Sequence, residues 1–263
     1  MRVKQKNRIP QLGQWCLLLC ALFWTGLSFS DSLKLSEPLK LATSSWPPYI
    51  DRELPNQGVA VEIVTKVFNR ANVKIEVIMI PSWKEVREGM EVGVYDAILG
   101  TWYSDERARF HQFSEPFMMN ELNFIKRKGS DISFNTLSDL EGLMIATVND
   151  YAYGEEFDTY PGIYQVKSNH VVQSLMNLID GRADLALGDV WVMRHELKNY
   201  MPSRLKDIDV IPKPLSEKGL RIAMSLYNKK GARILEVFNM EVSKMKKEGV
   251  IDTIIASHQK HYQ

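Results

Sequence analysis

Cysteine is nearly absent from this chain of 263 residues, and its two cysteines, Cys16 and Cys20, both lie close to the N-terminus. If that segment is removed, the remaining protein has no disulfide, no thiolate metal ligand and no cysteine nucleophile. Histidine is also scarce. Only His258 and His261 are closely spaced, and we expect a solvated C-terminus there rather than a zinc site. The sequence therefore predicts no metal and no cofactor, and the stability of the fold must come from an apolar core.

Excess charge is lacking too. The formal net charge is only +1, and residues 1–30 hold four of the 33 basic residues and no acid. The rest of the chain therefore carries 29 basic against 32 acidic residues, a net charge of −3. A mildly acidic surface gives no reason to expect binding to nucleic acid or to anionic lipid.

Long apolar runs are confined to residues 15–27, which follow a basic stretch and end in small residues that suit a signal peptidase. We therefore expect residues 1–30 to be a cleaved signal peptide, with Asp31 beginning the mature chain. One alternative is a retained membrane anchor, for which the run is short. The other is a lipoprotein, for which Leu19 is unsuited to precede Cys20. No later segment reaches bilayer length, so the sequence predicts a soluble periplasmic protein.

Strand-like and helix-like segments alternate through the rest of the chain, without an internal repeat. Strands are predicted where β-branched residues dominate, and helices where apolar residues recur three and four apart. The predicted strands are 39–43, 73–80, 95–100, 144–148, 163–166, 183–189, 208–212 and 220–226. The predicted helices are 59–71, 83–90, 171–180, one beginning near Val190, 231–247 and 249–259. This order indicates an α/β protein with parallel strands, as two small units or as one larger sheet.

Residues 95–117, YDAILGTWYSDERARFHQFSEPF, carry the most specific pattern. A strand with an Asp-Ala pair precedes an acid-acid-Arg run and then Phe-Ser-x-Pro-Phe. Four other segments accompany this pattern along the chain. The WPPY loop and the helix from Gly58 come before it, and the segments at 136–148 and 181–189 come after it. Together they resemble the family-three periplasmic solute-binding proteins, which include lysine/arginine/ornithine-, histidine- and glutamine-binding proteins. The resemblance covers residues 36–260.

The resemblance implies a type II periplasmic binding protein fold, in which two α/β lobes are joined by two crossing strands. Lobe one would comprise residues 31–118 and 222–263, and lobe two residues 119–221. A small ligand, an amino acid or a close relative, would bind between the lobes at the carboxyl ends of strands. The chain would act as a monomer without catalysis and would pass its ligand to the membrane permease of an ABC transporter.

Two charged residues fit a zwitterionic ligand, since burying an amino acid requires a partner for each of its charges. The planar fork of an arginine suits a carboxylate. The resemblance assigns this role to Arg107, with Arg109 as the neighbouring alternative; from the residues alone, Arg107 could equally be a solvated surface side chain. Asp189 occupies the family position of the acid that binds the ammonium, or it caps the helix that follows.

Four aromatic residues are candidates for the ligand cleft. Trp46 and Tyr49 follow the first predicted strand, and Trp46 matches the aromatic residue that packs on the ligand in relatives. Trp83 and Trp102 also fall at family cleft positions, although core packing is the commoner role of such residues. Trp102 departs from the family, because many relatives place there a Ser or Thr whose hydroxyl helps to bind the carboxylate. Thr101 is a nearby but displaced hydroxyl.

The turn at residues 147–157 completes the candidate site. In the family, its amides help to hold the ligand carboxylate at the positive end of a helix. Asp150 and Tyr151 are the candidates in this chain. Because an acid would repel a carboxylate, Asp150 either meets a cationic ligand side chain or caps the helix.

Two other functions are compatible with the pattern. A few proteins of this fold are cyclohexadienyl dehydratases, which need a general acid. His111, Glu115 or Glu155 would be the candidates, although no motif marks them. The second alternative is a ligand-sensing module that reports to a separate receptor rather than to a transporter.

Overall fold

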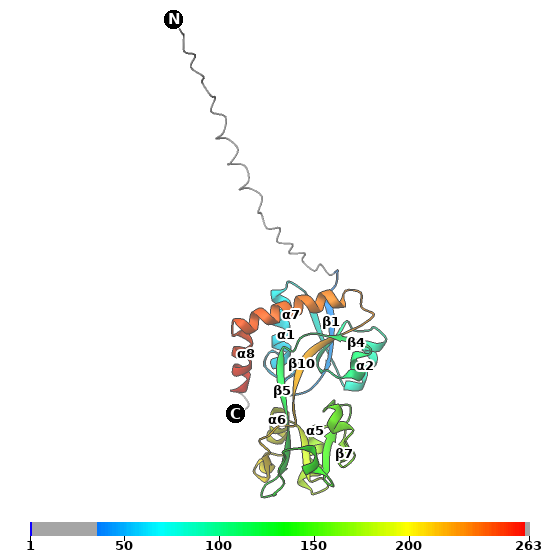
Figure 1. Ribbon diagram of the computed structural model, residues 1–263, viewed down its shortest axis with the longest axis vertical. Coiled ribbons are helices and arrows are strands. Elements are labelled where there is room, and N and C mark those ends of the chain that lie inside the picture. Colours follow the sequence, from blue (N-terminus) through cyan, green and yellow to red (C-terminus); the bar gives the residue numbers. More distant parts are fainter. Residues whose placement is uncertain (2–35, 261–263) are drawn as a thin grey trace. The chain divides into compact units, whose positions relative to one another are not determined.

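The computed structural model describes Met1 and residues 36–260 (Figure 1). The predicted signal peptide beyond Met1, the cleavage point before Asp31 and both cysteines lie outside the described residues, as does His261. Within the described part of the chain, no helix is both long enough and apolar enough to span a bilayer.

Strands and helices alternate along the described residues, as the sequence predicts. The strands are β1 (Leu39–Ser44), β2 (Ile75–Ile80), β3 (Ala97–Trp102), β4 (His111–Phe113), β5 (Met118–Arg127), β6 (Met144–Val148), β7 (Tyr164–Ser168), β8 (Leu185–Asp189), β9 (Ile208–Val210) and β10 (Ser216–Ser225). The α-helices are α1 (Val59–Arg70), α2 (Trp83–Glu91), α3 (Asp105–Ala108), α4 (Glu155–Asp158), α5 (Val171–Ile179), α6 (Val190–Tyr200), α7 (Gly231–Lys247) and α8 (Val250–Gln259). Short 3-10 helices are η1 (Pro55–Gln57), η2 (Leu137–Leu140) and η3 (Pro202–Asp207).

The strands join one sheet whose main order is β2-β1-β3-β10-β5-β8-β6-β7. β1 pairs in parallel with β2 and β3, and β6 pairs in parallel with β7 and β8. Between these two groups, β5 and β10 lie side by side and antiparallel, with Leu220 opposite Met118 (Figure 1). The chain thus passes from the first parallel group to the second through β5 and returns through β10. This is the double crossing that the resemblance implies.

β5 is the main element that the sequence pattern does not predict. Its strand includes Asn120 and Asn123, which interrupt the apolar pattern although both are buried, with 1% and 3% of their surface exposed. Buried amides need hydrogen-bond partners. Asn120 donates to Asp189, and Asn123 donates to the Ile211 carbonyl. These partners come from distant parts of the chain, so local pattern cannot reveal that asparagine is suited to this strand.

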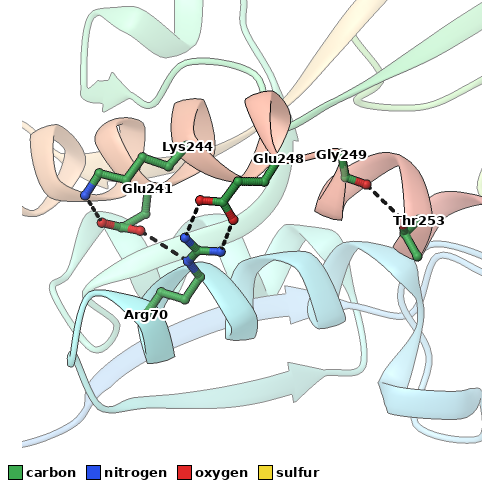
Figure 2. A network of polar contacts seen from close by, with 6 residues as sticks. All are labelled: Arg70, Glu241, Lys244, Glu248, Gly249 and Thr253. Carbon is green, nitrogen blue, oxygen red and sulfur yellow. Dashed lines mark hydrogen bonds and ion pairs between the residues drawn. The ribbon is translucent and has the colours of Figure 1, made fainter.

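The apolar face of α1 packs against the sheet and against α7 and α8. Its buried residues recur three and four apart, as an amphipathic helix requires, and the Phe68 ring lies 5.2 Å from that of Phe238 on α7. At the end of α1, Arg70 lies 2.6 Å from Glu248 and 3.4 Å from Glu241 (Figure 2). Because Arg70 and Glu248 are partly exposed, solvent screens these pairs, and the apolar contacts stabilise the helix packing more.

A less exposed contact joins α1 to α8. Glu62 Oε2 lies 2.7 Å from Nε2 of His258, whose surface is only 4% exposed, and it accepts a second hydrogen bond of 2.9 Å from Asn56. Burial raises the pKa of Glu62, but the hydrogen bonds from His258 and Asn56 lower it, and the resulting pKa is below the ordinary value.

Replacement of this carboxylate, Glu62→Gln, is expected to lower the free energy of unfolding at neutral pH by about 1.5–3 kcal/mol, the usual contribution of a hydrogen bond to a charged group. Because the folded-state pKa is the lower one, this contribution is present above the unfolded pKa and is lost as the pH falls through the folded pKa. Urea unfolding at neutral pH and near pH 3 measures the difference, which should shrink in acid. Glu236→Gln, which removes a partner of Arg233 on the surface, is the control; equal losses in both variants would contradict the prediction.

Candidate functional site

The predicted site residues follow the carboxyl ends of parallel strands, where α/β sheets commonly bind ligands. By strand, they are Trp46 and Tyr49 after β1, Trp83 after β2, Thr101, Trp102 and Arg107 at and after the end of β3, Asp150 and Tyr151 after β6, and Asp189 at the end of β8. Several contacts join the two parallel groups of strands, and two of them are hydrogen bonds. The Tyr49 hydroxyl donates to Asp189 Oδ2 at 2.8 Å, and Arg107 Nη2 donates to the Asp150 carbonyl at 2.9 Å. Distant segments of the chain therefore meet at one place.

Asp189 is the buried acid of this site, with 4% of its surface exposed. Its Oδ2 accepts hydrogen bonds from the Tyr49 hydroxyl and from Asn120 Nδ2, the latter at 3.1 Å. Its Oδ1 accepts from the Val192 amide at 3.0 Å, so the predicted cap of α6 is confirmed. Burial raises the pKa of Asp189 to about 6, although these hydrogen bonds act to lower it. Asp189 is thus mostly a carboxylate at neutral pH and titrates just below it.

Arg107 lies on the short helix α3, and oxygen atoms outside that helix accept hydrogen bonds from its guanidinium group. Its Nη1 donates to Thr101 Oγ1 at 3.0 Å and to the Trp102 carbonyl at 2.8 Å, while Nη2 makes the bond across the strand groups described above. The guanidinium carbon lies 5.7 Å from the centre of the Trp83 ring, a cation–π distance. Burial lowers the pKa of Arg107 to about 10, and the charge of Arg87 acts in the same direction. Arg107 is therefore a fixed cation at neutral pH and not a solvated surface side chain.

Five aromatic rings gather beside these charged groups. They belong to Trp46, Tyr49, Trp102, Tyr151 and Trp191. The rings of Trp46, Trp102 and Tyr151 are nearly perpendicular to one another, at 81° to 89°, with centroids 5.4 to 6.5 Å apart. The Tyr49 ring lies 4.6 Å from Trp46 and stacks 5.7 Å from Trp191. This five-ring cluster lies next to a cation and an acid.

Asp150 is exposed and has a left-handed backbone, with φ of 62°. Helix α4 begins at Glu155 and has Gly154 as its N-cap, so the interpretation of Asp150 as the cap of that helix is wrong. The Asp150 carboxylate instead lies 3.4 Å from Nη2 of Arg87 on α2.

The sequence profile of the bacterial extracellular solute-binding proteins, family 3, matches residues 39–261. The chain belongs to this family. The match spans most of the chain and all of the predicted site residues. No curated protein sequence matches the chain well enough to count as a relative.

Solved structures of solute-binding proteins share the fold of this chain. A mutant of the arginine-binding protein ArgBP from T. maritima has a TM-score of 0.68 and 22% identity, over 85% of this chain and 95% of that one. The substrate-binding protein of an amino acid ABC transporter has a TM-score of 0.66 and 22% identity, over 85% of this chain and 100% of that one. A histidine kinase sensor domain similar to periplasmic binding proteins has a TM-score of 0.68 and 20% identity, over 84% and 95%. At these identities the likeness shows the fold, and the predicted type II class is confirmed.

Asn120 lies within the candidate site and contacts two of its predicted residues, although no sequence pattern marks it. Its Nδ2 donates to Asp189, and its Oδ1 accepts from Trp102 Nε1 at 2.9 Å. Because the Trp102 carbonyl accepts from Arg107, one chain of contacts runs from the cation to the buried acid. A single asparagine in an unpredicted strand offers no signal from which this role could have been inferred.

Two further residues contact predicted residues of the candidate site, and their spacing along the chain could have pointed to them. Trp191 stands two positions after Asp189 on the first turn of α6, and its ring stacks on Tyr49. Arg87 stands one helical turn after Trp83 on α2, so its side chain projects from the same face of the helix. Once Asp189 and Trp83 are candidates for the site, the residue two positions after Asp189 and the residue four positions after Trp83 are therefore candidates as well.

The three residues considered as a general acid differ in their surroundings, and burial lowers the pKa of His111. His111 Nδ1 lies 3.2 Å from the Arg107 carbonyl, and Glu115 and Glu155 are exposed. In the part of the chain that the structure describes, no group of three or more His, Cys, Asp or Glu side chains is placed to hold a metal ion. The family consists mainly of binding proteins without catalysis, although dehydratases are related to it.

Proposed function

We propose that this solute-binding protein captures a small zwitterion, an α-amino acid, and passes it to the membrane permease of an ABC transporter. The observation that carries the proposal is the path of hydrogen bonds from Arg107 through Trp102 and Asn120 to Asp189. The ends of this short path are a cation and a buried acid. The ligand carboxylate would bind Arg107 and the ammonium would bind Asp189, each through charge-assisted hydrogen bonds. The five-ring cluster would pack on the body of the ligand.

Ligands with only one of these charges suit the site less well. A monocarboxylate or a sugar would leave the Asp189 carboxylate without a cationic partner, and a polyamine would leave Arg107 without an anionic one. An unpaired charge in a closed site is costly, since the surrounding side chains solvate it poorly. A zwitterion is the class of small molecule that pairs both.

Motion of two lobes would accompany binding. We assign residues 31–118 and 222–263 to lobe one and residues 119–221 to lobe two, with β5 and β10 as the connection. The Tyr49–Asp189 and Arg107–Asp150 contacts would then join the lobes, and a ligand held by both lobes would favour closure. Export with a cleaved signal peptide would place the monomeric protein in the periplasm.

A thermal-shift screen of the protein purified from the periplasm tests the ligand class. An α-amino acid at about a hundred times its dissociation constant is expected to stabilise the protein by about 2.7 kcal/mol. Simple amines and acids that lack the opposite charge should give much smaller shifts. With the best ligand, solution scattering should give a smaller radius of gyration, and the tryptophan fluorescence should change.

Two outcomes of the screen would overturn the proposal. One is a largest shift from an amine, a dicarboxylate without an ammonium or a sugar, with none from any amino acid. The other is consumption of an arogenate-like compound on incubation with the protein, as measured by absorbance. That result would make the chain a dehydratase.

A further inference from the structure

Arg87 carries a pair of hydrogen-bond donors that the protein itself only half satisfies. Its Nη2 lies 3.4 Å from Asp150 Oδ2, a single and rather long contact. Its Nε is buried and has no acceptor among the described residues. Buried polar groups are nearly always paired, so an orphaned N–H of this kind needs an explanation.

The geometry of guanidinium groups offers an explanation for the unpaired Nε–H of Arg87. Nε–H and one Nη–H of an arginine point the same way and can donate two parallel hydrogen bonds to the two oxygens of one carboxylate. A carboxylate that approached Arg87 from that side would satisfy Nε as well as Nη2. Asp150 is attached to its own backbone and contacts Nη2 alone.

The backbone conformation of Asp150 explains why its carboxylate lies near Arg87. The left-handed conformation, with φ of 62°, lets the Asp150 carbonyl accept from Arg107 while the carboxylate lies near Arg87. The side chain of Asp150 remains about half exposed, at 49%. An exposed acid held by one long contact can be displaced at little cost, whereas the carbonyl contact to Arg107 does not depend on the side chain.

We propose that Arg87 binds a second carboxylate of the ligand side-on, in place of the Asp150 carboxylate, and that the ligand is an acidic α-amino acid. This inference rests on the proposed function, which assigns the α-carboxylate of the ligand to Arg107. Arg87 and Arg107 lie near each other, because both contact Asp150, one at its carboxylate and the other at its carbonyl. Two neighbouring guanidinium groups match a short molecule with two carboxylates, and Asp189 matches its ammonium.

Calorimetric titration with glutamate and aspartate, against their amides glutamine and asparagine, tests the inference. The parent protein is expected to bind the better acidic ligand at least tenfold more tightly than the matching amide. Arg87→Gln should remove this preference, and Arg87→Lys should restore only part of it, because lysine keeps the charge and lacks the fork. Lys84→Gln is the matched control, since Lys84 lies on the same helix, is exposed and pairs only with Glu88 among the described residues; it should leave the preference unchanged.

Asp150→Asn separates this role from a purely structural one. Asparagine tolerates the left-handed backbone and keeps the carbonyl that binds Arg107. Removing the competing carboxylate should raise the affinity for the acidic ligand several-fold and leave the affinity for its amide nearly unchanged. An ion pair that only stabilised the fold would give the opposite sign, with weaker binding of both ligands.

Three outcomes would overturn the inference and leave the proposed function intact. In the first, amino acids bind but the acidic ones show no preference. In the second, Arg87→Gln weakens the acidic ligand and its amide equally, which would mean that Arg87 shares the α-carboxylate with Arg107. In the third, Asp150→Asn weakens both. If no α-amino acid binds at all, the proposed function itself fails.

Discussion

Arg107→Ala is expected to weaken ligand binding by about 3–5 kcal/mol, on the order of a hundredfold or more. The substitution removes the charge-assisted hydrogen bonds to the ligand carboxylate and leaves that carboxylate unpaired in a closed site. It also removes the bond to the Asp150 carbonyl, which links the two groups of strands. Isothermal titration with the best ligand from the screen measures the loss.

Arg109→Ala is the matched control for this experiment. Arg109 stands two residues further along and is exposed, and it was the alternative carboxylate partner in the sequence. Its replacement should change the affinity by less than about twofold, as is usual for surface substitutions. If the Arg109 variant lost most of its affinity while the Arg107 variant bound normally, Arg109 rather than Arg107 would be the partner of the ligand carboxylate. Thermal unfolding of both variants separates a binding defect from a folding defect.

Asp189→Asn is expected to weaken amino-acid binding at least tenfold, which corresponds to about 1.4 kcal/mol, while the protein still folds. Asparagine caps helices about as well as aspartate, so the hydrogen bond to the Val192 amide can persist. What is lost is the negative charge that pairs with the ligand ammonium. Asp180→Asn, which removes an exposed partner of Arg182, is the control and should bind normally. Tight binding by the Asp189 variant would mean that Asp189 serves only as the cap of α6.

The pH dependence of binding gives an independent measure of Asp189. Its pKa of about 6 means that lowering the pH from 7 to 5 protonates the carboxylate and removes the partner of the ammonium. Affinity should therefore fall across this range in the parent protein and change much less in the Asp189 variant. Burial also raises the pKa of Glu196 to about 7 and lowers the pKa values of His111 and His195, so a slope that remains in the variant comes from groups other than Asp189. A parent affinity that is constant from pH 7 to 5 would contradict the assignment.

The alternation of strands and helices follows from periodicity, and most predicted elements are present with ends shifted by a few residues. Apolar periodicity does not predict β5, because its buried asparagines resemble surface residues in the sequence, and only the family resemblance implies a crossing strand near Phe117–Asn120. The asparagines are tolerated only because partners such as Asp189 and the Ile211 carbonyl reach them in the folded sheet. The sequence pattern could not decide whether the strands form two small sheets or one larger sheet. That depends on β10, which joins the two parallel groups by pairing with both β3 and β5.

The candidate site, like the fold, could be predicted only in part from the sequence. Arg107 and Asp189 were selected because a zwitterion needs a fixed cation and an acid, and the family order placed both. The relation between them was not visible, since it passes through Asn120 and through the carbonyl rather than the side chain of Trp102. The role of Asp150 also changed, because its carboxylate lies near Arg87, which follows a different strand.

The sequence by itself determined that this protein is an α/β solute-binding protein of family 3, and which charged residues are the candidates for binding. Both are encoded locally, in apolar periodicity and in short motifs. Only the tertiary structure decided what those residues contact. Tyr49 and Asp189 are 140 positions apart, and Asn120 and Asp189 are 69 apart. Strand order brings such residues within hydrogen-bond distance, and strand order depends on the packing of the whole sheet rather than on any local stretch of sequence.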